Sequence, residues 1–147
     1  MNAKFLLFSN LLITFFLMGL IWLVQMVQYP GFAKVGAEAF HTYHQLHVEH
    51  IAWVVAVPMV LELLLALGML FIRPSQLDLI LSVLLFLLVG ATWVITFFVA
   101  MPYHDQLASQ GFDAEIIQKL ININWVRTAA WTLRGGILAF IVYRVWH

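Results

Sequence analysis

The segment HTYHQLHVEHIAWVVAVPMVLE, residues 41–62, joins two kinds of sequence within one candidate helix. Its first half carries a histidine at every third position, namely His41, His44, His47 and His50. Its second half is apolar except for Glu62. A helix continuous through both halves has a histidine-rich end at a water interface and a carboxylate inside a bilayer. We therefore expect a membrane helix that carries chemistry at one end and in its interior.

The composition indicates a membrane protein. Of the 147 residues, 64% are hydrophobic and 10% are charged, whereas soluble domains are about 25% charged. The formal net charge is zero, so no basic surface is available for nucleic acid. The absence of cysteine excludes disulfides and thiolate metal sites. We expect one integral membrane domain over residues 1–147, with the lipid bilayer as its main partner.

Four apolar segments are each long enough to cross a bilayer, which takes about 20 residues. They cover residues 5–27, 51–72, 77–101 and 120–146, and polar loops cover 29–50 and 102–119. From about Ala37, the first loop is expected to form a polar helix that leads into the second span. The first segment is too long for a signal peptide and no cleavage site follows it, so we expect it to be retained. The predicted fold is an all-α four-helix membrane bundle.

Prolines mark the ends of the predicted spans. Pro30 and Pro102 are expected to end the first and third spans, and Pro58 to kink the second. Shifting the chain by 72 residues aligns Pro30 with Pro102, Trp53 with Trp125 and Glu62 with Arg134. This match favours a duplicated two-helix hairpin with both copies in the same orientation. The alternative is that two hairpins of equal length resemble each other without duplication.

Four spans place both termini on the same side of the membrane. Three cations fall on that side and two on the other: Lys4, Arg73 and Arg144 against Lys34 and Lys119. Because cytoplasmic loops carry the excess of Lys and Arg, we expect cytoplasmic termini, and the resemblance described below implies a bacterial inner membrane. Both polar loops, with five of the six histidines, then face the extracytoplasmic side.

Glu62 and Arg134 should lie at similar depths, because each follows a matching tryptophan by nine residues. A charge at mid-membrane costs about 2.5 kcal/mol or more, so we predict that the two form a buried ion pair. The pair either fixes the packing of the helices or serves as a proton relay or substrate anchor.

The last span presents Asn124, Arg127, Trp131 and Arg134 on one helical face, at steps of three, four and three. Three roles are open for Arg127. It snorkels to the interface, binds an anion or carbonyl group, or pairs with Glu49 or Asp105. Asn124 and Arg127 are candidate catalytic residues.

The histidines suggest a metal or haem site. Steps of three turn a helix by about 300°, so all four cannot converge on one ion, but neighbouring pairs can. The candidate metal ligands are His44, His47 and His50, with His104, Asp105 or Glu49 completing a site. A haem or another cofactor would be held by His44, His47 and His104. The alternatives are a solvated interfacial helix and a pH-sensing cluster. The tyrosines and tryptophans are expected mainly at the membrane interfaces.

Several segments resemble a group of small bacterial four-span proteins of unassigned function: QYPGFAKVG, YHQLHVEH, MPYHDQLASQGFD and ININWVRTAAWTLR. That group is distantly similar to the anthrone-oxygenase-like membrane family. The similarity rests on the four-helix layout and on Asn124 and Arg127 in the last helix. The resemblance implies oxidation of flat polycyclic phenols. The histidine run is not a feature of those oxygenases.

The leading functional prediction is a membrane oxidoreductase or oxygenase-like protein that takes an apolar ligand from the bilayer. The candidate catalytic residues are His47, His50, Arg127, Asn124 and Tyr43, near the extracytoplasmic surface, with a divalent metal or haem as candidate cofactor. The alternatives are a structural or assembly subunit of a membrane complex, a homo-oligomer, and a small transporter.

Overall fold

The computed structural model describes residues 2–147, and every regular element among them is helical. A first rod contains α1 (Ala3–Leu23), the π-helix η1 (Val24–Gln28) and α2 (Tyr29–Phe32). The second is α3 (Ala37–Phe71). The third contains α4 (Leu79–Ile95), the π-helix η2 (Thr96–Ala100) and α5 (Met101–Gln110), and the fourth is α6 (Ala114–Trp146).

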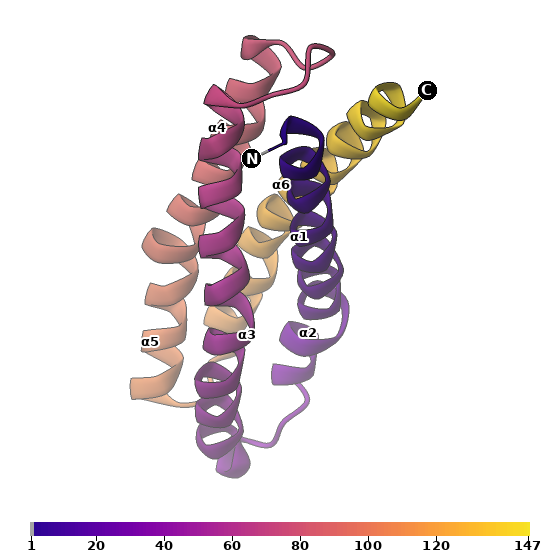
Figure 1. Cartoon of the computed structure of the whole chain (residues 1–147). Coiled ribbons are helices and arrows are strands. Elements are labelled where there is room, and N and C mark those ends of the chain that lie inside the picture. The colour runs from indigo at the N-terminus through magenta and orange to yellow at the C-terminus, as the bar shows by residue number, and fades with distance from the viewer. Residues whose placement is uncertain (1) are drawn as a thin grey trace.

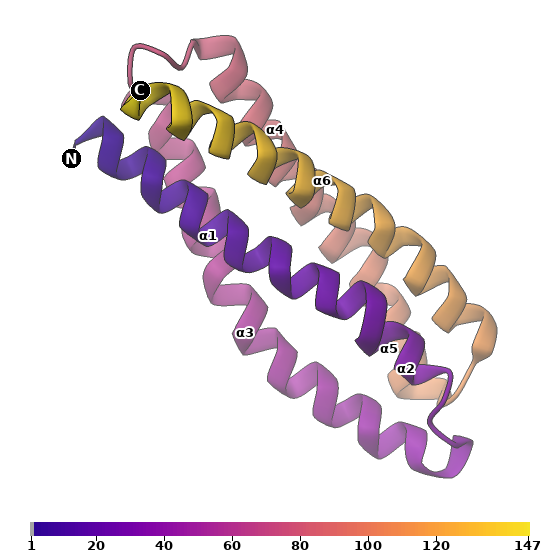
Figure 2. The same cartoon turned by 90° about the vertical axis from the view of Figure 1, so that its right-hand side faces the viewer.

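The four rods form an elongated bundle with both termini at the same end (Figure 1). α1 and α4 each pack against both α3 and α6, so α3 and α6 are diagonal partners across the bundle axis (Figure 2). The histidine-rich beginning of α3 lies at the end opposite the termini.

Local sequence signals set most helix boundaries. Asn2, Asp78 and Asp113 are N-caps whose side chains accept hydrogen bonds from first-turn amides of α1, α4 and α6. Such a cap satisfies an amide that has no partner within the helix. α5 ends at Gly111, whose φ of +83° is readily adopted by glycine. The polar ends of the rods are therefore encoded locally.

Two predicted helix ends are wrong. The chain stays helical through Tyr29-Pro30 and Met101-Pro102, and each proline is preceded by a π-helical segment. In these segments the amides of Tyr29 and Met101 donate to the carbonyls of Val24 and Thr96, five residues earlier. Proline has no N–H, and the wider π turn lets the helix continue past it. The predicted loops 29–50 and 102–119 shorten to residues 33–36 and 111–113.

The helix expected from about Ala37 begins there and continues through Pro58 to Phe71. Its 35 residues correspond to about 52 Å at about 1.5 Å per residue. That length exceeds the hydrocarbon core, which is about 30 Å thick. The histidine-rich turns therefore extend α3 beyond its apolar part.

The π-helices recur with the spacing at which the sequence predicts a repeat. Val24–Gln28 and Thr96–Ala100 are 72 residues apart, as are Pro30 and Pro102. The diagonal partners α3 and α6 carry Glu62 and Arg134, which also differ by 72. This arrangement agrees with two similar hairpins that face each other.

Within the described residues, three helical rods are long and apolar enough to cross a membrane: Ala3–Phe32, Ala37–Phe71 and Leu79–Gln110. Large apolar side chains are exposed along them, including Trp53 at 77%, Ile80 at 84% and Phe98 at 76%. Because a soluble protein rarely exposes such surface, the fold is a helical bundle compatible with an integral membrane protein.

The interior contains two apolar clusters. One, at the terminal end, is built around Leu7, Met69 and Leu138. The other, toward the histidine-rich end, is built around Phe32, Met59 and Leu120. Polar side chains lie at the level between them, and they form the first part of the candidate site.

Candidate functional site

A buried polar network surrounds Arg134 between the two apolar clusters. Arg134 Nη1 lies 2.7 Å from Glu62 Oε1, and the side chains are 1% and 0% exposed. The structure thus brings together the two residues predicted to pair. Arg134 also donates to Thr14 Oγ1, to Asn10 Oδ1 and, from Nε, to the carbonyl oxygen of Leu85 at 3.2 Å.

The carboxylate of Glu62 is equally well bonded. Oε1 accepts from the Thr14 hydroxyl at 2.9 Å, and Oε2 accepts from the indole N–H of Trp131 at 3.0 Å. The network takes side chains or carbonyls from α1, α3, α4 and α6. A buried ion pair stabilises a fold only when further hydrogen bonds satisfy both charges, and that condition is met here. The network therefore fixes the register of all four rods.

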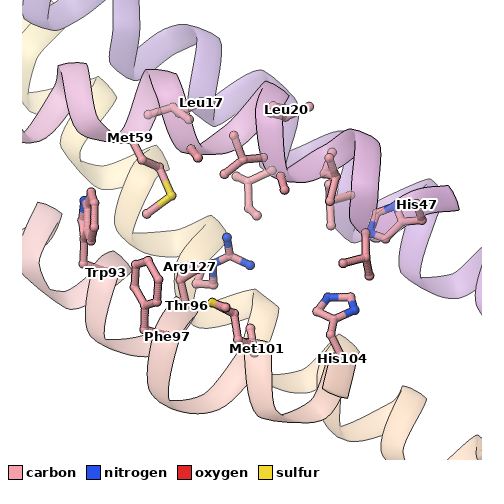
Figure 3. A pocket seen from close by; sticks show the side chains of 18 of the residues that line it. Leu17, Leu20, His47, Met59, Trp93, Thr96, Phe97, Met101, His104 and Arg127 are labelled. Carbon is pink, nitrogen blue, oxygen red and sulfur yellow. The ribbon is translucent and has the colours of Figure 1, made fainter. Parts of the chain in front are cut away.

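A cavity of about 400 Å³ lies on the histidine-rich side of this network. Its wall is largely apolar and draws on all four rods, including Leu17, Met59, Phe97 and Met101 (Figure 3). Trp131 lines this cavity and also bonds to Glu62, so its indole ring separates the cavity from the ion pair. The volume is within the range of small-molecule sites, about 300–1,000 Å³.

Arg127 extends its guanidinium group into this cavity (Figure 3). The residue is only 5% exposed. Nη1 donates to Asn124 Oδ1 at 3.1 Å, Nε is buried without a hydrogen-bond partner, and the guanidinium carbon lies 5.4 Å from the centre of the Trp131 ring. Within residues 2–147, Arg127 forms no salt bridge with an acidic side chain. A buried cation is therefore held beside an apolar cavity with no counter-charge from the described residues.

Neighbouring side chains hold Arg127 in place. Asn124 is fully buried, and its amide N–H donates to Gln25 Oε1 at 2.9 Å, which leaves its oxygen free to accept from Arg127. Gln25 belongs to η1, so the π-helical turn presents this amide to α6. π-helical turns occur frequently at functional sites.

A second unsatisfied donor lies in the same wall. The indole Nε1 of Trp93 is buried without a hydrogen-bond partner, and Trp93 lines the cavity. Buried polar groups without partners are uncommon in folded proteins and call for an explanation. Two residues of the cavity wall, Arg127 and Trp93, thus each have a buried N–H without a partner among residues 2–147, which favours a ligand that carries acceptors.

Three side chains form a hydrogen-bonded chain at the histidine-rich end. The Tyr29 hydroxyl lies 3.1 Å from His104 Nε2, and His104 Nδ1 lies 3.0 Å from His44 Nε2. The rings of His47 and His104 are stacked with their centres 5.7 Å apart. The two imidazoles lie side by side at the same end of the cavity (Figure 3). Tyr29, His47 and His104 line the cavity, whereas His44 lies behind them and is 1% exposed. Such a chain is able to transfer a proton between the cavity and buried imidazoles.

The cavity opens to the surface at the side of the bundle, where some of its lining residues are exposed. Ala52 and Ala56 on α3 line the cavity and are exposed, as are Phe97 and Met101 on the facing wall. A residue that both lines the cavity and is exposed marks its mouth. The mouth therefore lies between α3 and the η2–α5 rod, at the side of the bundle.

The structure brings some predicted site residues together and leaves others apart. His47, His104, Asn124 and Arg127 are in or next to the cavity. His50 is exposed, and its Nδ1 bonds to the Leu46 carbonyl at 2.8 Å. Tyr43 is 38% exposed, and its hydroxyl accepts from Gln28. Neither His50 nor Tyr43 lines the cavity. His50 is turned about 60° from His47 around α3. Tyr43 is on the same face as His47 but one turn nearer the start of the helix, where its hydroxyl meets Gln28.

Two proposed partners of Arg127 are not used. Glu49 is exposed and accepts a hydrogen bond from Gln45. Asp105 lines the cavity at its exposed edge but forms no salt bridge with Arg127 in residues 2–147. Snorkelling is also not observed, since the Arg127 head group is buried.

The predicted metal ligands do not converge. Within residues 2–147, no group of three His, Asp or Glu side chains is arranged to hold a metal ion. His44 is buried and His50 is exposed, because each step of three residues turns the helix by about 300°. The residues therefore do not fit the predicted metal site at His44, His47 and His50.

A haem held by His44, His47 and His104 stays a prediction. Both ring nitrogens of His104, and Nε2 of His44, already have hydrogen-bond partners. An iron bound through His104, or through Nε2 of His44, would have to break these bonds. We derive no chemistry from a metal or haem at this site.

Several residues of the site were not predicted. Asn10, Thr14 and Gln25 lie on the buried side of the first rod, and Tyr29 and Trp93 were expected at the membrane interfaces. The signal for the first two was a pair of polar residues four apart within an apolar run, which places them on one helical face. No comparable signal identifies Trp93, because its spacing also fits an interfacial position.

Comparison of the chain with protein-family models, with characterised proteins and with solved structures gives no match. The resemblance to the anthrone-oxygenase-like family, carried by Asn124 and Arg127, stays a prediction.

Proposed function

We propose that this protein spans a membrane four times and binds an apolar small molecule in the cavity, with an oxygen atom of the ligand held by Arg127. The main support is one observation. A buried guanidinium that has no acidic partner among residues 2–147 extends into an apolar cavity of about 400 Å³. Keeping such a group unpaired is costly, so it indicates a binding role rather than a structural one.

α6 is the fourth span in this proposal. Its two central arginines, Arg127 and Arg134, are buried, whereas Trp125, Leu133 and Phe140 are 46%, 54% and 60% exposed. The surface it offers to lipid is therefore apolar although its sequence is polar. The termini are cytoplasmic and the cavity lies toward the extracytoplasmic side, in keeping with the excess of positive charge at the terminal end.

The ligand enters from the lipid through the mouth beside Ala52 and Ala56. Because exposed apolar residues surround this mouth, a molecule dissolved in the bilayer reaches the cavity without crossing water. Its oxygen-bearing end then meets Arg127, and the wall around Met59 and Phe97 takes the apolar part.

The chain Tyr29–His104–His44 favours a second, catalytic role. It is placed to give a proton to, or take one from, an oxygen of a ligand that lies next to Tyr29. An oxidoreductase that acts on a carbonyl or phenolic ligand requires such a proton transfer. Its electrons would come from a redox partner or co-substrate that the site itself does not supply.

Fluorescence quenching tests the binding proposal. The reporter is a variant in which the four exposed tryptophans, Trp22, Trp53, Trp125 and Trp146, are replaced by Phe. Trp93 and Trp131 then remain, and both line the cavity. The reporter in nanodiscs is titrated with the methyl ester of dibromostearic acid, whose bromine atoms quench indole fluorescence on contact. We expect saturable quenching in addition to the linear quenching from the bulk lipid.

Two further variants decide the outcome. Ala56→Phe fills the mouth and is expected to abolish the saturable part. Leu133→Phe adds the same ring on the lipid-facing side of α6, where 54% of Leu133 is exposed, and is expected to change nothing. Absence of saturable quenching by the ester and by the free acid alike, or saturable quenching that survives in Ala56→Phe, would overturn the proposal.

A further inference from the structure

The charge of Arg127 also bears on the class of ligand. The groups next to the guanidinium are Asn124, Trp131 and the Tyr29 hydroxyl, and none of them carries a formal charge. Asp105 is the acidic residue among those that line the cavity, and it lies at the exposed edge without reaching Arg127. The protein thus leaves one positive charge unbalanced inside the bundle.

A neutral carbonyl group would not balance that charge. Its oxygen accepts hydrogen bonds but leaves the buried cation without an opposite charge. A carboxylate supplies the charge and accepts two parallel N–H bonds from one guanidinium edge. The unpaired Nε of Arg127 is available for one of them.

Other parts of the wall also favour an anion. Its second unpaired donor, Trp93 Nε1, cannot accept a hydrogen bond. The neighbouring ion pair offers no competing cation, because Arg134 is engaged by Glu62, Thr14 and Asn10. An acceptor-only head group therefore finds donors at Arg127 and meets no buried carboxylate in the cavity.

The apolar wall indicates that the part of the ligand beyond its head group is a hydrocarbon. Leu17, Met59, Val55 and Phe97 line the cavity, and its mouth opens toward lipid at Ala52 and Ala56. A hydrocarbon tail longer than the cavity can pass through this mouth and stay in the bilayer. Resting on the binding site proposed above, we propose that the ligand is a lipid-derived amphiphile with a single carboxylate, such as a long-chain fatty acid.

The test compares two probes that differ in charge. Dibromostearate and its methyl ester are titrated into the two-tryptophan reporter at a pH at which the acid is ionised. A charge-assisted hydrogen bond is worth about 1.5–3 kcal/mol, so the acid is expected to bind at least about 10-fold more tightly than the ester.

Variants locate this preference. Arg127→Gln is expected to remove it, lowering acid binding at least about 10-fold while ester binding changes little. Arg127→Lys is expected to keep part of it, which guards against loss through misfolding. Arg144→Gln is the matched control, because Arg144 is exposed near the other end of α6 and the change in net charge is the same. The control is expected to leave both titrations unchanged.

The possible failures are distinct. Equal saturable binding of acid and ester, or an equal loss of acid binding in Arg144→Gln, would overturn the carboxylate proposal and leave the binding site standing. Saturable binding of neither probe would overturn both proposals.

Discussion

Arg127 and Arg134 lie seven residues apart on the same face of α6, and both are buried. Arg134 has an acidic partner at 2.7 Å and further hydrogen bonds to Thr14, Asn10 and Leu85. Arg127 has one hydrogen bond to Asn124, an unpaired Nε and a cavity in front of it. The same residue type in the same helix therefore has two different environments.

The difference arises from the side chains that α3, the diagonal partner of α6, places opposite each arginine. At the level of Arg134, α3 places Glu62 on the bundle axis, and the two long side chains fill the interior. At the level of Arg127, α3 offers small or apolar side chains, such as Ala52 and Val55, and the interior stays open. A satisfied polar network adds rigidity, whereas an unsatisfied buried charge is retained only for a gain elsewhere.

The largest effect is expected from breaking the ion pair. Arg134→Met leaves Glu62 buried without its counter-charge, so we expect a loss of about 3–5 kcal/mol in the free energy of unfolding. Equilibrium unfolding in detergent micelles measures it. Arg144→Met removes an exposed arginine from the same helix and should change stability little.

A double-mutant cycle sharpens this result. If the two groups are coupled, the Glu62→Gln, Arg134→Gln double variant is less destabilised than the sum of the single variants. Additive losses would show that the pair does not act as a unit.

The two tryptophans of the cavity provide a matched comparison. Trp131→Phe removes an N–H that donates to Glu62, whereas Trp93→Phe removes an N–H that has no partner. Both lose similar apolar volume. We expect Trp131→Phe to cost about 1.5–3 kcal/mol more than Trp93→Phe, because its bond is to a charged group. Equal losses of unfolding free energy would contradict the assignment of the two indole groups.

A smaller effect is expected in the chain at the histidine-rich end. Tyr29→Phe removes the hydroxyl bonded to His104. Hydrogen bonds between membrane helices average about 0.6 kcal/mol, with a maximum of about 1.7 kcal/mol, and we expect a loss of unfolding free energy within that range. Tyr43→Phe is the control, because its hydroxyl meets Gln28 at an exposed position. A loss above about 3 kcal/mol would indicate a packing defect rather than one hydrogen bond.

The smallest stability effect is expected at Arg127, where the contrast with Arg134 is sharpest. Arg127→Met removes an unbalanced charge and leaves Asn124 without one hydrogen bond. These two effects oppose each other, so we expect the ligand-free protein to change by less than about 1 kcal/mol. A loss comparable to that of Arg134→Met would show that Arg127 is part of the structural framework.

The sequence predicts the polar residues better than the helix ends. Glu62 and Arg134 are recognisable because isolated charges in apolar segments have to pair. The helix ends predicted at Pro30 and Pro102 are wrong, because a π-helical turn lets each helix continue past its proline. No residue in the π-helical segments VQMVQ and TFFVA indicates such a turn from sequence alone. The histidine spacing suggests a metal site, but which imidazoles face inward depends on the rotation of α3 within the bundle.

The sequence by itself determined the all-helical class, the inward face of α6 that carries Arg127 and Arg134, and the need to neutralise two charges within apolar surroundings. These follow from local periodicity and from the cost of burying charge. Only the tertiary structure decided that Arg127 has no acidic partner in the part of the chain that is described. It also decided that Tyr29, His104 and His44 form one chain and that a cavity lies beside them. Such features depend on which side chains of separate helices meet, and the spacing within one helix does not specify those contacts.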